Sequence, residues 1–197
     1  MDGLALTQHG LPPAQGEQEH RSLALANSVV TLPGGLRADL LGDPDHVGVW
    51  LAERGFAPAG LDVEENCAAQ IRSLREQIRS LFGSLTAGTT ALPAAIAAVN
   101  DAMTRASALP LLRWSETSGP YRAAPPPIGA ILEHAMAALA ADAADLITSP
   151  DADRLTACGS APCNRYLLRH GRRQWCSTRC GDRARAARSY SRRAKAS

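Results

Sequence analysis

Four of the five cysteines lie within 23 residues near the C-terminus, and this cluster constrains the fold more than any other feature of the sequence. Their order is Cys158-x4-Cys163-x12-Cys176-x3-Cys180. Two short-range pairs with a spacer between them supply the four soft ligands of a tetrahedral zinc ion. Because four thiolates leave no coordination position open, the spacing predicts one structural Zn²⁺ and not a catalytic metal.

Other uses of these cysteines fit the spacing less well. A thioredoxin-type redox pair has the spacing Cys-x-x-Cys, which neither pair has. His170 lies in the spacer and is an alternative fourth ligand. An iron–sulfur cluster is a further alternative, although the common ferredoxin patterns differ. We expect the fifth cysteine, Cys67, to pack as a small apolar side chain.

The second cysteine pair is spaced i, i+4, so both thiolates lie on one face if this segment is helical. Ser177 is placed to cap the helix that follows. Large apolar residues are few in this part of the chain. A module with so small a core depends on its metal to fold.

Charge divides the chain into two unequal parts. Residues 151–197 carry 12 Lys+Arg and 3 Asp+Glu, a formal charge of +9, whereas the other 150 residues carry a formal −7. This asymmetry predicts two functional bodies, of which the basic one binds an anion such as DNA. A solvated, frayed basic tail is the alternative. The candidate contacts to DNA phosphates or bases are Arg172, Arg173, Arg179, Arg183, Arg185, Arg188, Arg192, Arg193 and Lys195.

The first 150 residues favour helices, because alanine and leucine are frequent and aromatic residues make up only 4% of the chain. Turn residues around 111–124 predict a small β-hairpin, and we expect Trp50 and Trp114 to anchor the core. The predicted fold is therefore mainly α: a helical N-terminal domain with a small β-hairpin, plus a small C-terminal zinc-finger module with four cysteine ligands. The apolar spacing predicts helices within 19–30, 42–56, 62–85, 92–106 and 128–148.

The predicted organisation has three parts: a disordered tail over 1–18, a helical domain over 19–150 and a zinc finger with a basic helix over 151–197. The sequence contains no recognisable catalytic motif, so we expect no enzyme activity. It shows no apolar run long enough to span a membrane and no secretory signal at its start. We therefore expect a cytoplasmic protein with reduced thiols.

Two stretches resemble known families. The segment WCSTRCGDRARAARSYSRR, residues 175–193, is similar to the C-terminal signature of the CGNR zinc finger. The segment LALANSVVTLPGGLRADLLGDPDHVGVWLAERGF, residues 23–56, resembles the ABATE domain that precedes that finger. The resemblance covers about residues 20–193.

This resemblance implies a bacterial transcription regulator linked to stress responses. The finger would bind DNA, and the helical domain would sense a small molecule or contact a protein effector. An RNA- or protein-binding adaptor that uses the same basic module is the alternative. The chain departs from the CGNR motif at Asp182, where the motif has asparagine. An acidic group would repel DNA at a contact position, or it could pair with Arg179 or Arg185.

Overall fold

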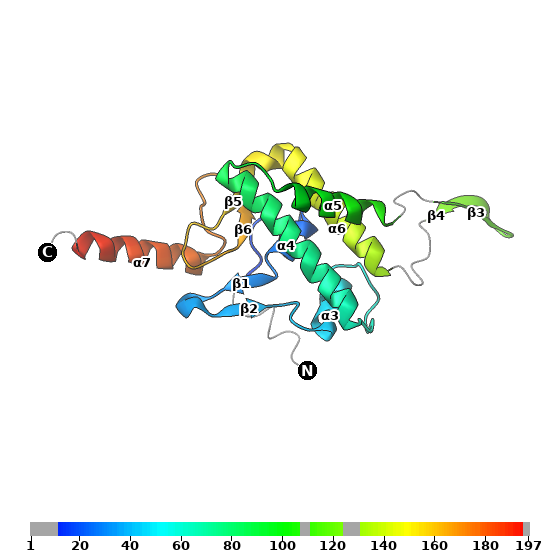
Figure 1. The fold of residues 1–197 in the computed structure, drawn as a ribbon, viewed down its shortest axis with the longest axis horizontal. Coiled ribbons are helices and arrows are strands. Elements are labelled where there is room, and N and C mark those ends of the chain that lie inside the picture. Colours follow the sequence, from blue (N-terminus) through cyan, green and yellow to red (C-terminus); the bar gives the residue numbers. More distant parts are fainter. Residues whose placement is uncertain (1–11, 107–110, 124–130, 195–197) are drawn as a thin grey trace.

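The computed structural model describes residues 12–106, 111–123 and 131–194. Within these ranges the fold is mainly helical, as predicted, with short two-stranded antiparallel sheets (Figure 1). The helices are α2 (Arg21–Ala26), α3 (Pro44–Glu53), α4 (Glu65–Ala87), α5 (Pro93–Thr104), α6 (Ile131–Thr148) and α7 (Thr178–Ala194). The strand pairs are β1 (Val29–Thr31) with β2 (Arg37–Asp39), β3 (Leu111–Ser115) with β4 (Gly119–Ala123), and β5 (Leu155–Ala157) with β6 (Tyr166–Leu168).

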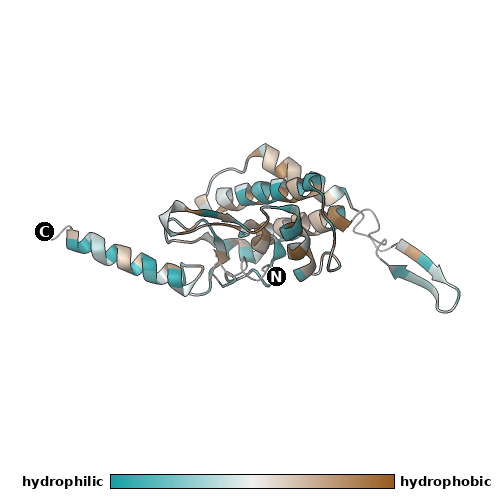
Figure 2. Ribbon diagram, turned by 90° about the horizontal axis from the view of Figure 1, so that it is seen from below, coloured by the Kyte–Doolittle hydropathy of each residue, from teal (hydrophilic) through white to brown (hydrophobic). Residues whose placement is uncertain are grey.

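The long helix α4 is the centre of the core. Ile71, Leu74, Ile78 and Leu81 recur at helical spacing and are buried, as the spacing predicted, whereas Leu85 at the end of the same stripe is 40% exposed. α2, α5 and α6 pack around α4, and their buried side chains join the same core. Hydrophobic residues are concentrated in this body, whereas the extended C-terminal helix is largely hydrophilic (Figure 2).

Helix α3 begins with a capping residue and a proline. The Asp43 side chain accepts a hydrogen bond from the N–H of His46, and Pro44 occupies the first turn. Trp50 is buried, as expected. A side-chain carbon added at Gly48 would lie only 2.7 Å from the carbonyl oxygen of Leu61, so the absence of a side chain lets α3 pack against the following loop.

The β1–β2 hairpin was not predicted. The Pro-Gly-Gly break in the sequence forms its turn, and both Gly34 and Gly35 adopt positive φ. Thr31 and Arg37 pair at the turn end of the hairpin, and Val29 pairs with Asp39 at its base. Strands of three residues are too short to show a clear alternation of apolar and polar positions.

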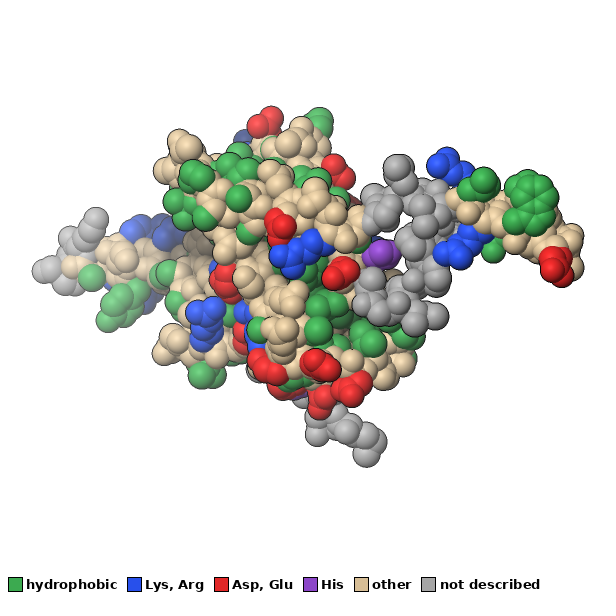
Figure 3. Space-filling view, turned by 45° about the vertical axis from the view of Figure 1, so that its right-hand side comes forward, with side chains coloured by type: hydrophobic (Ala, Val, Ile, Leu, Met, Phe, Trp, Pro, Cys, Tyr) green, Lys and Arg blue, Asp and Glu red, His purple; other side chains and the backbone are tan. Residues whose placement is uncertain are grey.

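The predicted hairpin over 111–124 is confirmed as β3–β4, but its expected contribution to the core is not. Trp114 is 75% exposed, because the hairpin extends away from the helical body (Figures 1 and 3). Its two strands form a sheet of their own. The expectation that Trp114 anchors the core was therefore wrong.

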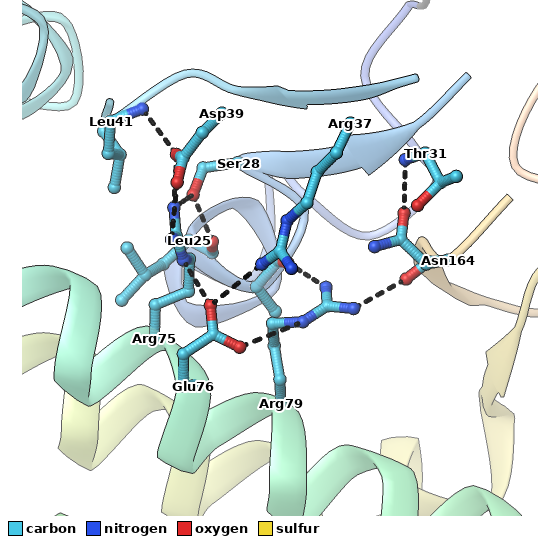
Figure 4. Close-up of polar contacts among 11 residues, drawn as sticks. Leu25, Ser28, Thr31, Arg37, Asp39, Leu41, Arg75, Glu76, Arg79 and Asn164 are labelled. Atoms are coloured by element: carbon cyan, nitrogen blue, oxygen red, sulfur yellow. Dashed lines mark hydrogen bonds and ion pairs between the residues drawn. The ribbon is translucent and has the colours of Figure 1, made fainter. Parts of the chain in front are cut away.

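An ion pair joins the base of the β1–β2 hairpin to α4 (Figure 4). Arg75 is only 3% exposed and donates to both carboxylate oxygens of Asp39, at 2.6 and 2.8 Å. Burial would raise the pKa of Asp39, but the hydrogen bonds from Arg75 and from the N–H of Leu41 outweigh it and hold that pKa below 3.8. Glu76 accepts from Arg75 at 3.0 Å and also faces Arg37 and Arg79.

Part of the expected disordered tail is ordered. Ala14 is buried, the N–H of Leu168 donates to the carbonyl of Gln15, and Gly16 packs against the Leu168 side chain. The expectation of disorder over 1–18 is thus corrected for residues 12–18, because this segment covers β6. Residues 1–11 lie outside the described residues.

The segment that carries the cysteines packs on the helical body. Leu155 in β5 and Leu168 in β6 belong to the same core cluster as α4 and α6. The core therefore continues across the boundary expected at residues 150 and 151. In the described part of the chain, no helix is both long and apolar enough to cross a membrane.

Candidate metal centre and basic helix

The four clustered cysteines converge on one point. Their sulfur atoms all lie within 4.8 Å of one another. The Sγ of Cys176 is 3.7 Å from that of Cys163 and 3.6 Å from that of Cys180. Sulfurs at the corners of a tetrahedral site with Zn–S bonds of about 2.3 Å stand about 3.8 Å apart. The donor set and its spacing thus fit one zinc ion.

Short-range hydrogen bonds shape the two halves of this site. The N–H of Cys158 donates to the carbonyl of Arg165, and the N–H of Cys163 closes a turn on the carbonyl of Ser160. On the other half, the hydroxyl of Ser177 accepts from the N–H of Cys180, which confirms the predicted helix cap. His170 is exposed and is not part of the cluster.

Four thiols at this spacing cannot all ionise by themselves. Hydrogen bonding to Cys158 is the main cause that raises the pKa of Cys163 to about 11, and it also raises the pKa of Cys176. The same hydrogen bonds, from Cys163 and Cys176, lower the pKa of Cys158 to about 2. A dication would favour the thiolate form of every ligand, so the cluster suits a metal better than free thiols.

Two arginines donate to the sulfurs. Arg165, which is 4% exposed, reaches Cys176 at 3.8 Å, the carbonyl of Pro12 at 3.0 Å and the carboxylate of Glu17 at 2.8 Å. A zinc ion with four thiolates carries a formal charge of −2, and a buried guanidinium offsets part of it. Sequence reasoning missed Arg165, because nothing in the local sequence distinguishes it from the neighbouring arginines.

Arg183, a predicted DNA contact, is hydrogen-bonded to the metal centre. Its guanidinium donates to the carbonyls of Ala161 at 3.0 Å and Ser160 at 3.1 Å, and to the Sγ of Cys180 at 3.3 Å. This side chain therefore ties the second turn of α7 to the loop that carries the other ligand pair. The predicted helical continuation beyond Cys180 is confirmed as far as Ala194.

Trp175 forms a platform beside the first turns of α7. The guanidinium carbons of Arg185 and Arg188 lie 5.8 and 5.4 Å from its ring centre, within the range of a cation–π interaction. The ring can come this close because position 181 is glycine: a side-chain carbon there would lie 3.3 Å from the ring. Trp175 was not among the predicted site residues.

Asp182 faces solvent on the same part of α7. Its carboxylate accepts from the guanidinium of Arg185 at 2.5 Å, one of the two pairings that the sequence suggested. Arg185 therefore contacts both an acid and the Trp175 ring.

The remaining predicted contacts lie at the surface. Arg172 and Arg173 are exposed in the loop before Trp175, and the Nε of Arg173 donates to the carbonyl of Trp175. Arg179, Arg192 and Arg193 are exposed on α7. Lys195 lies outside the described residues.

The metal loop is hydrogen-bonded to the helical body through Asn164. Its carboxamide oxygen accepts from the N–H of Thr31 at 2.8 Å, and its carbonyl accepts from Arg79 on α4 at 3.1 Å (Figure 4). Close by in the chain, Tyr166 exchanges two hydrogen bonds, both 2.8 Å, with the side chain of Asn27. A cavity of about 310 Å³ at this junction is lined by Thr31, Leu32, Pro33, Cys163, Arg179, Cys180 and Arg183.

Comparison with protein families gives two matches. Residues 19–150 match the ABATE family, described as "Putative stress-induced transcription regulator", and residues 154–193 match the CGNR zinc finger. No curated protein matches the chain. The zinc-finger match and the convergence of the sulfurs together assign one structural Zn²⁺ to Cys158, Cys163, Cys176 and Cys180.

Proposed function

Because the chain belongs to the ABATE family and carries a CGNR zinc finger, we propose that it regulates transcription by binding DNA through α7. The main support is the placement of this helix. It leaves the body at the metal centre and extends into solvent (Figure 1), with most of its arginines exposed. A polyanion could approach this helix without any rearrangement of the body.

The metal centre supplies rigidity at the base of the helix. Cys180 is a zinc ligand in the first turn, and Arg183 in the next turn is bonded to the opposite loop. The turns beyond carry Arg185, Arg188 and Arg192 at steps of three and four residues, so these side chains share one face. Guanidinium groups bind phosphate oxygens and the edges of guanine in a fork geometry.

In this proposal the helical domain receives the signal, which is a small molecule or a protein effector. Support comes from the hydrogen bonds that join α4 and the β1–β2 hairpin to Asn164, next to the ligand Cys163. A conformational change in α4 or in the β1–β2 hairpin would therefore be transmitted to the metal loop through these hydrogen bonds. The proposal involves no catalytic step, and it places the protein in the cytoplasm, where bacterial DNA is accessible.

The proposal is tested by measuring the affinity of the zinc-loaded protein for duplex DNA over a range of salt concentrations. The logarithm of the affinity should fall linearly with the logarithm of salt concentration, by about 0.9 per phosphate neutralised. Arg188→Ala should weaken binding to every duplex, reduce the slope by about one such unit and leave zinc bound.

Arg105→Ala is the matched control, because Arg105 is an exposed arginine at the end of α5, in the helical domain. It should leave DNA affinity unchanged. Tighter binding to RNA of the same length, or equal losses in the two variants, would contradict the proposal and favour an adaptor role.

A further inference from the structure

Asp182 is the only acidic residue in α7, which carries six arginines from Arg179 to Arg193. Its carboxylate accepts from Arg185 at 2.5 Å, and both side chains are largely exposed, at 71% and 61%. The pair therefore lies on the surface that the proposed function presents to DNA, and it makes no contribution to the core.

Arg188 provides an internal comparison on the same helix. It lies over the same Trp175 ring as Arg185, at 5.4 Å, but its Nε donates to the backbone carbonyl of Ala184. The aromatic platform thus orients two guanidinium groups, of which that of Arg185 is also held by a carboxylate. Arg185 should therefore bind phosphate less readily than Arg188.

We propose that Asp182 weakens the binding of α7 to DNA by occupying the guanidinium of Arg185, an inference that rests on the proposed function. The carboxylate takes an N–H of Arg185 at Nη2, so a phosphate that binds this guanidinium competes with the carboxylate. The carboxylate also stays nearby and repels the phosphate. Since the pair is exposed, this competition costs little, and DNA binding is weakened but not prevented.

A purely structural role for Asp182 must be distinguished from this one. An acid near the start of a helix can stabilise it through the helix dipole. If that were its main role, removing the charge would loosen α7 and reduce DNA affinity. Asp182→Asn removes the charge and keeps the side-chain size, so the two roles predict opposite changes.

The experiment is a double-mutant cycle of Asp182→Asn and Arg185→Ala, read by affinity for duplex DNA at several salt concentrations. Asp182→Asn alone should raise the affinity roughly two- to fivefold, the range that an exposed ion pair contributes. It should also steepen the salt dependence, because Arg185 becomes free to neutralise a phosphate. In the Arg185→Ala background the same substitution should have a clearly smaller effect. Zinc content and helical circular dichroism should not change.

The possible failures can be told apart. An unchanged or lower affinity of Asp182→Asn would overturn the inference, as would an equal rise in both backgrounds, since the carboxylate would then act without Arg185. If the wild type binds DNA and Arg188→Ala weakens that binding, the proposed function survives whatever the effect of Asp182→Asn. If neither the wild type nor Asp182→Asn binds duplex DNA, the proposed function itself fails.

Discussion

At the scale of single residues, two buried arginines hold together parts of the chain that are far apart in sequence. Arg75 on α4 pairs with Asp39 at the base of the β1–β2 hairpin. Arg165 pairs with Glu17 beneath the metal centre. A buried charge that loses its partner is costly, because nothing replaces its lost hydration. The partners of these arginines should therefore matter more to stability than exposed acids do.

Asp39→Asn should lower the free energy of unfolding by about 1.5–3 kcal/mol at neutral pH, the range for hydrogen bonds to a charged group. Because the folded-state pKa of Asp39 is lowered, its contribution is present above the unfolded value of 3.8 and is lost as the pH falls through the folded value. The difference between variant and wild type should therefore shrink in acid. Urea unfolding at several pH values measures it.

Asp101→Asn is the control for this experiment, since Asp101 forms an exposed ion pair with Arg105. It should cost less than about 1 kcal/mol. If the two substitutions lowered the free energy of unfolding equally at neutral pH, the buried pair of Arg75 would contribute no more to stability than the exposed pair.

Arg165→Met should weaken zinc binding by roughly 10- to 100-fold, the usual effect of losing a group that supports a metal ligand. The variant loses the donor to Cys176 and leaves Glu17 without its cation. Competition with a chromophoric zinc chelator measures the affinity. Arg169→Met, an exposed position in the same segment, should bind zinc like the wild type. Arg165→Met with unaltered zinc affinity would contradict a role in supporting the metal.

At the scale of elements, the helices were predictable because their apolar residues recur at helical spacing. The cap of α7 was predictable from Ser177. The β1–β2 and β5–β6 hairpins were not, since each strand has only three residues. In α5 the large Ile96 is 45% exposed, because the helix buries its smaller neighbour Ala95 instead.

Two glycines within helices should respond differently to alanine. Gly48→Ala places a carbon 2.7 Å from the Leu61 carbonyl, which forces the backbone apart and should destabilise the fold by about 1–3 kcal/mol. At Gly83 the nearest atom is the hydroxyl of Tyr166, at 3.3 Å. Alanine also favours the helix by about 1 kcal/mol, so Gly83→Ala should be neutral or stabilising. Thermal unfolding compares the two, and a Gly48→Ala protein as stable as Gly83→Ala would contradict the close packing of α3.

At the scale of the whole molecule, the metal segment and the helical body share one core. Leu155 and Leu168 pack with α4 and α6, and the ordered residues 12–18 cover β6. The sequence predicted all four zinc ligands, because their spacing is local and specific. It could not predict Arg165, Glu17 or Asn27, because their roles depend on contacts between the two ends of the chain. The charge asymmetry did not predict this packing, because the basic segment shares the core of the acidic helical body.

Removal of zinc should therefore destabilise the helical body as well as the finger. A strong chelator should lower the midpoint of thermal unfolding measured by the helical circular dichroism of the whole chain. Cys67→Ala, which leaves the zinc ligands intact, should show the same chelator dependence as the wild type. If the chelator removed the zinc but left the midpoint of thermal unfolding unchanged, the shared core would not couple the stability of the helical body to that of the finger.

The contacts around the first turns of α7 also bear on how such a helix can be re-engineered or can diverge. Cys180 is fixed by the metal, Gly181 by the nearby indole and Arg183 by the carbonyls of the opposite loop. Position 182 differs from these three, because its side chain points into water and pairs with the exposed Arg185. Under the proposed function, exchanging that side chain should adjust the affinity for DNA while the scaffold stays intact, which makes it the natural first position for a saturation library.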